Sequence, residues 1–295
     1  MPLQLQQPCL TKPKLLAVAR LMRLDKPVGI YLVLWPALWS LFLAAEGMPD
    51  WQNLVIFSLG ALIMRSAGCV INDLADQRFD GHVRRTRERP LVSGKLSPQE
   101  AYYLLAALLM LALLLVAFTN MLTVLLSIGA LALASVYPFM KRHTHLPQVV
   151  LGAAFAWSIP MAFAAQTGAL PPALWLIFTA TMLWTVVYDT FYAMVDRDDD
   201  LKIGVKSTAI LFGDNDRYIT MGLQVMVVVA LLMIGDRFEL GLIYHTAVTS
   251  VVALFVYQQW LIRRREAEHC FQAFMNNHWV GMAIFIGIAL DTTLL

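Results

Sequence analysis

Long apolar runs alternate with short polar segments along almost the whole chain. A helix needs about 20 apolar residues to cross a bilayer, and nine runs come close to that length. The pattern predicts an all-α, polytopic membrane protein with nine transmembrane helices. The runs cover residues 28–45, 51–71, 99–117, 120–138, 148–165, 173–194, 219–235, 241–261 and 275–293.

Residues 1–27 precede the first run and predict a cytoplasmic, amphipathic or irregular lead-in, followed by a single transmembrane domain over residues 28–295. Pro27 is well placed for the first turn of a helix, where its missing N–H costs nothing. The lead-in has no short apolar core followed by small residues at a cleavage site. We therefore predict no removable signal peptide.

Composition agrees with a membrane protein. Of the 295 residues 59% are hydrophobic and 14% are charged, whereas a soluble domain carries about 25% charged residues. The net charge of +2 does not indicate a nucleic-acid partner. Cys9, Cys69 and Cys270 lie far apart without zinc-site spacing, so we predict that they are unpaired.

Lys and Arg gather in every second connection. Of the 22, all except Arg65 and Arg237 lie in the lead-in or after the second, fourth, sixth and eighth runs. Cytoplasmic loops are the ones rich in Lys and Arg. The basic side is therefore predicted to be cytoplasmic, and an odd number of spans puts the C-terminus on the opposite side.

Acidic side chains gather where the second and sixth apolar runs end. At helical spacing the members of each set share one helix face, where like charges destabilise the helix. Near lipid each carboxylate costs about 2.5–3.5 kcal/mol, so a cation has to offset both sets. Mg²⁺ is usually held by one or two carboxylates plus substrate phosphates. We therefore predict a diphosphate site at a membrane surface, formed by Asn72, Asp73, Asp76 and Asp80 with Asp189, Asp196 and Asp200.

An acidic residue at a helix end can instead have a purely structural role, as a solvated cap that faces water and pairs with loop arginines. We assign Asp214, Asp216 and Asp236 to that class. The two larger sets are different, because acidic residues within or beside a membrane are functional by default.

Several cations lie on the same side as the acidic sets. Arg65 is seven residues before Asn72, on the same helix face and about 10 Å deeper. A buried Arg needs an acidic partner. That partner is either Asp189, in a structural salt bridge, or a substrate group, namely a carboxylate or the diphosphate. Arg23 is a second candidate for binding the substrate group.

Further cations on this side are Lys141, Arg142, Lys202 and Lys206. Tyr137 and Lys141 are four residues apart and so can face one site. Both residue types are also common interfacial anchors, and that interpretation stays open for this pair.

Three spaced motifs resemble signatures of the UbiA superfamily of intramembrane prenyltransferases. They are Asn72-Asp73-x-x-Asp76-x-x-x-Asp80, Tyr137-x-x-x-Lys141 and Asp196-x-x-x-Asp200. Residues 188–200 and 203–213 are similar to the branch of this superfamily that prenylates 4-hydroxybenzoate. The likeness runs from about Arg20 to the C-terminal helix, and the first 15 residues carry no match.

The resemblance implies nine helices around a central cavity with a cytoplasmic-side cap, a bacterial inner membrane and a role in ubiquinone synthesis. It also implies that Mg²⁺ and a polyprenyl diphosphate are bound between two sets of residues, namely Asn72, Asp76 and Asp80, and Asp196 and Asp200. Tyr137 and Lys141 would lie beside the diphosphate. The carboxylate of 4-hydroxybenzoate would be bound by Arg142, with Arg65 and Arg23 as rivals.

Two other functions stay open from the residues alone. One is an ion-coupled transporter with acidic residues near the bilayer midplane, which fits less well because these acidic sets lie at helix ends. The other is a related prenyltransferase that uses another acceptor, such as a naphthoate or a haem.

Overall fold

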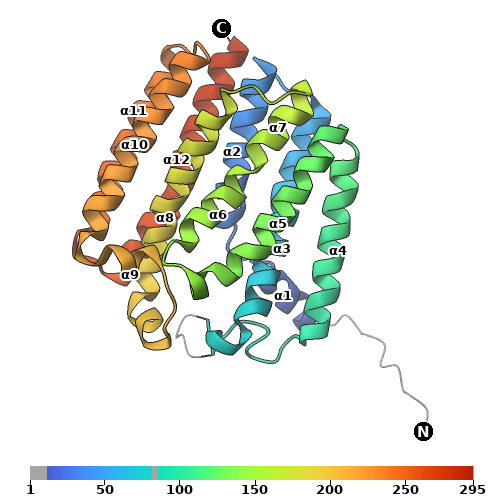
Figure 1. The fold of residues 1–295 in the computed structure, drawn as a ribbon, viewed down its shortest axis with the longest axis vertical. Coiled ribbons are helices and arrows are strands. Elements are labelled where there is room, and N and C mark those ends of the chain that lie inside the picture. The colour runs from blue at the N-terminus through green and yellow to red at the C-terminus, as the bar shows by residue number, and fades with distance from the viewer. Residues whose placement is uncertain (1–11, 82–85, 295) are drawn as a thin grey trace.

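The structure, a computed structural model, describes residues 12–81 and 86–294, except the side chains of residues 12 and 78–80. Within this part every regular element is a helix, which confirms the all-α prediction. Figure 1 shows the long helices standing side by side as one bundle. The elements are α1 (Lys12–Leu21), α2 (Val28–Ala45), α3 (Trp51–Asp80), α4 (Pro98–Ala117), α5 (Met121–His143), α6 (Pro147–Ala156), α7 (Ser158–Thr167), α8 (Leu174–Ile203), α9 (Thr208–Phe212), η1 (Gly213–Asn215), α10 (Asp216–Arg237), α11 (Leu242–Leu261), η2 (Ile262–Arg264) and α12 (Ala267–Leu294).

Each of the nine predicted runs is helical. Eight segments of the described chain are long and apolar enough to cross a membrane, and the protein is a multi-pass membrane protein. The run that is not among the eight is α11, whose 20 residues include the polar His245, Gln258 and Gln259. The number of nine spans stays a prediction.

The two helices that carry the acidic sets are longer than a membrane is thick. α3 and α8 have 30 residues each, which at about 1.5 Å per residue is about 45 Å, against a hydrocarbon core of about 30 Å. Both continue beyond the predicted runs, which stop at residues 71 and 194. Their C-terminal ends lie at the same end of the bundle as α1 and α9, and α12 ends at the opposite end (Figure 1).

The run predicted at 148–165 consists of two helices, α6 and α7, that meet at Trp157. Pro160 explains the break, because it has no N–H and its ring collides with the carbonyl four residues earlier, at Ala156. Trp157 keeps helical backbone angles, so the chain is kinked and does not form a loop. Its indole N–H donates to the carbonyl of Leu126 in α5 (2.8 Å).

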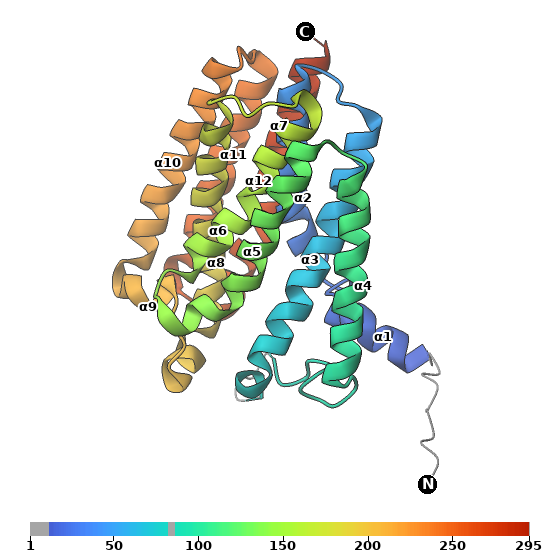
Figure 2. The same ribbon diagram turned by 45° about the vertical axis from the view of Figure 1, so that its right-hand side comes forward.

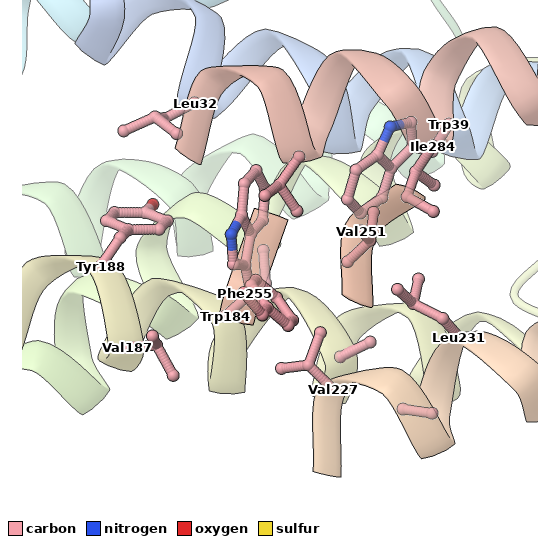
Figure 3. Packing of buried hydrophobic residues seen from close by; sticks show 14 of the residues in the cluster. Leu32, Trp39, Trp184, Val187, Tyr188, Val227, Leu231, Val251, Phe255 and Ile284 are labelled. Atoms are coloured by element: carbon pink, nitrogen blue, oxygen red, sulfur yellow. The ribbon is translucent and has the colours of Figure 1, made fainter. Parts of the chain in front are cut away.

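The largest hydrophobic core lies between α2, α8, α10, α11 and α12, and Figure 3 shows part of it. Trp39 of α2 stacks on Trp184 of α8 with ring centroids 5.5 Å apart, and its indole N–H donates to the carbonyl of Gly281 (3.0 Å). A Cβ at Gly281 would lie 2.2 Å from Trp35. Only glycine therefore lets α2 and α12 approach so closely.

Asp216 is not the solvated cap that the sequence predicts. Its carboxylate is fully buried and lies between Arg197 of α8 (3.1 Å) and Arg265, which precedes α12 (2.9 Å). The first turn of α10 packs against these two segments, so the charge is buried and paired. Asp214 and Asp236 have exposed side chains, as a solvated cap should.

We expect Asp216→Asn to lower the free energy of unfolding by about 1–3 kcal/mol, since two guanidinium groups lose their shared partner. Both arginines are partly exposed, and solvent screening limits the loss. Thermal unfolding in detergent, followed by far-UV circular dichroism, measures this loss. Asp214→Asn is the control, because its side chain is exposed two residues away. Equal melting temperatures for the two variants would contradict a stabilising role for Asp216.

Candidate active site

The ends of α3 and α8 face one small chamber of about 150 Å³. From α3 it is lined by Asn72 and Asp76, and from α8 by Asp189, Asp196 and Asp200. The two acidic stretches, more than a hundred residues apart in the sequence, thus lie around one space. Parallel α3 and α8 of equal length bring them to the same depth.

Asp76 is buried at the wall of this chamber. Its Oδ2 forms an ion pair with the amino group of Lys141, at the end of α5. Its Oδ1 lies 3.9 Å from Arg142 Nη2 and has no hydrogen-bond partner among the described residues. A buried carboxylate oxygen without a donor is costly, and a divalent cation would satisfy it.

The described side chains, those of residues 13–77, 81 and 86–294, do not form a complete protein cage for a metal. Among them no group of three His, Cys, Asp or Glu side chains is close enough to hold an ion. Asp80 ends α3, and its side chain lies outside the described part. The donor set fits Mg²⁺, which takes one or two carboxylates and completes its shell with water and phosphate oxygens.

Asp73, the second acidic residue of the first motif, has a different environment. It is buried, and its carboxylate accepts two hydrogen bonds from Arg23 Nη2 (2.9 and 3.1 Å). Arg89 Nη1 lies 3.1 Å away. The charge of Asp73 is therefore compensated inside the protein, and it ties the α1–α2 connection and the loop after α3 to α3.

Arg89 is a residue that the sequence analysis did not single out. It is one of several basic residues in its loop, and its spacing in the sequence assigns it no role. In the structure it lines the small chamber and also the larger cavity beside it. Its guanidinium thus lies at the junction of the two spaces.

The predicted cations divide into three groups. Lys141 and Lys206 line the chamber, and the amino group of Lys206 donates to the carbonyl of His143 (3.4 Å). Lys202 lies outside: its side chain is 73% exposed and pairs with Asp199. Arg142 is exposed, donates to the carbonyl of Ala75 (2.6 Å) and is not among the described residues that line either space.

A larger cavity of about 1010 Å³ runs along α3, between α2, α4 and α5. Its walls are mostly apolar and reach from the acidic end to Ile56 and Thr119 near the opposite end. Several residues line both the cavity and the small chamber, so the two spaces adjoin. These shared residues are Asn72, Arg89, Tyr137, Asp189 and Tyr192.

Arg65 lies in the wall of this cavity. Its Nη1 donates to Cys69 Sγ (2.7 Å), and its Nε is buried without a hydrogen-bond partner in the described part of the chain. A Cβ at Gly29 of α2 would lie 2.5 Å from Nε, so glycine provides the space for the guanidinium. Cys69 and Cys270 are free thiols, as predicted, and Cys9 lies outside the described residues.

The arrangement has a clear chemical capacity. A charged chamber can bind a diphosphate through a metal ion and basic side chains, and an apolar cavity beside it can hold a hydrocarbon chain. Arg65 provides a positive charge in the wall of that cavity, which can orient an anionic acceptor.

Comparison with known sequences agrees with this geometry. Residues 33–281 match the UbiA prenyltransferase family. A 4-hydroxybenzoate octaprenyltransferase of Saccharophagus degradans is 63% identical over 280 residues, which cover 95% of this chain and 94% of the relative. The protein of that name from Ectopseudomonas mendocina is 60% identical, with 93% of each chain covered.

Solved structures share the fold. A UbiA homolog from Aeropyrum pernix superposes with a TM-score of 0.79 at 24% identity, covering 88% of this chain and 97% of that one. A UbiA homolog from Archaeoglobus fulgidus bound to GPP and Mg²⁺ superposes with a TM-score of 0.73 at 20% identity, covering 95% and 100%. With its acidic chamber, its helical bundle and relatives of this similarity, the chain belongs to the UbiA prenyltransferase family.

Proposed function

We propose that this protein transfers a polyprenyl group, an octaprenyl group by analogy with its relatives, from its diphosphate to 4-hydroxybenzoate. The group is attached to the ring carbon ortho to the hydroxyl, as a step of ubiquinone biosynthesis. One observation carries the proposal: the two acidic helix ends line a chamber that adjoins a long apolar cavity and shares wall residues with it. The names of the relatives favour 4-hydroxybenzoate over a naphthoate or a haem as the acceptor.

The chamber is assigned to the diphosphate and its metal. Bound Mg²⁺ would neutralise the charge that develops on the leaving diphosphate, and the Mg²⁺-bound relative with GPP supports this assignment. On this protein we assign the metal–diphosphate complex to Asn72, Asp76, Asp80, Asp196 and Asp200. Lys141, Lys206 and Arg89 add positive charge at the same place, and fixed charges of this kind act most strongly away from water.

The cavity is assigned to the acceptor and the prenyl chain. Arg65 would bind the carboxylate of 4-hydroxybenzoate by a charge-assisted hydrogen bond and so fix which ring carbon faces the allylic carbon. Tyr137, Asp189 and Tyr192 line the junction, where the ring and the allylic carbon would meet. The ring carbon forms the new C–C bond as the allylic C–O bond breaks, and the ring proton leaves to restore aromaticity.

For the membrane orientation we propose a bacterial inner membrane with the chamber end in the cytoplasm. The distribution of Lys and Arg supports this orientation, and it makes the C-terminus periplasmic. Residues 28–295 then form a single transmembrane domain, with residues 1–27 as a cytoplasmic lead-in. Mg²⁺ and 4-hydroxybenzoate, which are both water-soluble, would then reach the site from the cytoplasm.

The test is an assay of membranes that contain the protein, with Mg²⁺, a polyprenyl diphosphate and labelled 4-hydroxybenzoate. We expect a C-prenylated hydroxybenzoate, loss of turnover with EDTA and recovery with added Mg²⁺. Matched reactions with a dihydroxynaphthoate and with haem test the other acceptors, and uptake into sealed vesicles tests transport. Prenylation of another acceptor alone, or uptake without product, would overturn the proposal.

A further inference from the structure

The short helix α1 lies on the outside of the bundle, at the end that carries the acidic chamber. Figure 2 shows it beside the lower part of α4 and across the direction of the long helices. Its inner face carries Ala17 and Leu21, which are buried in one hydrophobic cluster with Ala67 of α3 and Ala101 of α4. Because α1 crosses the membrane helices, its axis runs along the plane of the membrane.

The contacts of α1 with α4 fix its depth in the membrane. Lys14 forms an ion pair with Glu100 in the first turn of α4. Tyr102 and Tyr103 follow on α4 with side chains that are 60% and 76% exposed. Exposed tyrosines at the end of an apolar helix are typical of the boundary between lipid and water. α1 is therefore level with the headgroup layer and the first carbon atoms of the acyl chains.

The outer face of α1 is apolar. Leu15 and Leu16 have side chains that are 52% and 56% exposed. They point away from the face that buries Ala17 and Leu21, since each residue turns a helix by about 100°. A helix at this depth with apolar side chains on its outer face is typical of a helix that lies in the membrane interface.

Basic side chains accompany this apolar face. Residues 12–27 contain five Lys or Arg and a single acidic residue. Two of the five, Arg20 and Lys26, have exposed side chains. Their long stems can follow the apolar surface while the charged groups reach the headgroups. Basic side chains beside a bilayer attract anionic phospholipids, so the charge of this segment complements an anionic membrane surface.

Arg23 connects α1 to the wall of the large cavity. It follows the helix in a left-handed conformation, with a φ of 57°, and its Nη1 donates to the carbonyl of Arg20 (2.9 Å). Its Nη2 donates to the buried carboxylate of Asp73 in α3. Both Arg23 and Asp73 line the cavity. A displacement of α1 would therefore move a side chain that compensates a buried charge in the cavity wall.

We propose that α1 is an interfacial helix that binds anionic phospholipids of the leaflet at the chamber end, and that this contact holds Arg23 in place against α3. Leu15 and Leu16 then contact the acyl chains, and Arg20 and Lys26 contact the lipid phosphates. This lipid contact is independent of the prenyl transfer proposed above.

The position of α1 is tested with a bimane label on Leu16→Cys in nanodiscs. The background is Cys9→Ser, and the thiols of Cys69 and Cys270 are buried. We expect quenching by lipids with brominated acyl chains and little quenching by iodide in the water. Leu201→Cys is the control, because its side chain is 58% exposed near the end of α8 and iodide should quench it. At position 16, quenching by iodide, or weak quenching by both agents, would overturn the proposal, since the outer face would then be in water or covered by protein.

The class of lipid is tested with the same label. Brominated phosphatidylglycerol should quench it with an apparent affinity higher than that of brominated phosphatidylcholine, by about fivefold for each cation at the surface. Arg20→Gln with Lys26→Gln should remove this difference, and so should high salt. Lys202→Gln is the matched control, since its exposed side chain lies on α8. Equal quenching by the two lipids in the protein that keeps both cations would overturn the assignment to anionic headgroups.

The link to Arg23 is tested by hydrogen exchange in nanodiscs. Leu15→Gln with Leu16→Gln should speed the exchange of backbone amides in residues 15–26 by about tenfold, because the opening of a segment depends on the contacts that hold it. Leu201→Gln is the control and should leave this exchange unchanged. The wild-type protein should also exchange faster here in phosphatidylcholine alone than in a bilayer with phosphatidylglycerol. Unchanged exchange in either comparison would contradict the proposed role of the lipid contact.

Discussion

Asp76→Asn and Asp196→Asn are each expected to lower kcat by at least about 10²–10³-fold, the loss that follows when one stabilising group for developing charge is removed. Both substitutions keep the shape of the side chain and remove its charge. Asp76 has the larger structural consequence, since its Oδ2 also pairs with Lys141 and its buried Oδ1 accepts no hydrogen bond from the described residues. In each variant the Mg²⁺ concentration needed for half-maximal activity should rise.

Turnover is measured in membranes at several Mg²⁺ concentrations, and the amount of inserted protein is measured in parallel. Asp198→Asn is the matched control: it lies on α8 beside the second motif, its side chain is exposed, and it does not line the chamber. Wild-type turnover by Asp76→Asn or Asp196→Asn would refute the assignment of the chamber to a metal–diphosphate complex. A loss in all three variants would point to damage of the helix end.

Arg65→Met is expected to raise KM for 4-hydroxybenzoate by about 10- to 100-fold, because a hydrogen bond to a charged group contributes about 1.5–3 kcal/mol. KM for the prenyl diphosphate should stay within about twofold of wild type, as Arg65 lies in the cavity and not in the chamber. A phenol without the carboxylate should be a poor acceptor for both proteins, with no further loss in Arg65→Met.

Gly29→Ala tests the same contact without removing the charge. The new Cβ would lie 2.5 Å from Arg65 Nε, at the far end of a flexible side chain that has to move. We therefore expect a higher KM for 4-hydroxybenzoate here also. Gly68→Ala is the control, since it lines the same cavity and its added Cβ would meet no atom within 4 Å.

Arg142→Met tests whether Arg142 or Arg65 binds the carboxylate of 4-hydroxybenzoate. From the sequence Arg142 is the first candidate for the aromatic carboxylate, with Arg65 and Arg23 as rivals, and Arg23 pairs with Asp73 in the structure. The structure has Arg142 exposed at the end of α5, where it contacts the carbonyl of Ala75. A larger increase of KM for 4-hydroxybenzoate in Arg142→Met than in Arg65→Met would show that Arg142, and not Arg65, binds the carboxylate of 4-hydroxybenzoate.

Arg142 and Arg65 illustrate why sequence spacing did not decide this point. Spacing assigns residues to a helix face, but it does not say which face borders an empty space. Arg142 follows Lys141 directly, and one residue is a rotation of about 100° around the helix. Lys141 therefore lines the chamber while Arg142 does not. Arg89 was missed for a similar reason, since only the folded loop brings it to Asp73.

The sequence by itself determined the fold class, the positions of the membrane helices and the location of the acidic residues at two helix ends. These features follow from local pattern, because apolar runs of sufficient length and residues three or four apart act through the helix that contains them. The family resemblance was also present in motifs that are contiguous or regularly spaced along the chain.

Only the tertiary structure decided how these elements meet. The common chamber of α3 and α8, the cavity beside Arg65 and the burial of Asp216 all depend on contacts between segments far apart in the chain. Such contacts depend on which side chains fill the space between helices and on where glycine leaves room for a neighbour, as Gly29 does for Arg65 and Gly281 for Trp35. Close packing of this kind is a property of the assembled interior, and no single segment contains it.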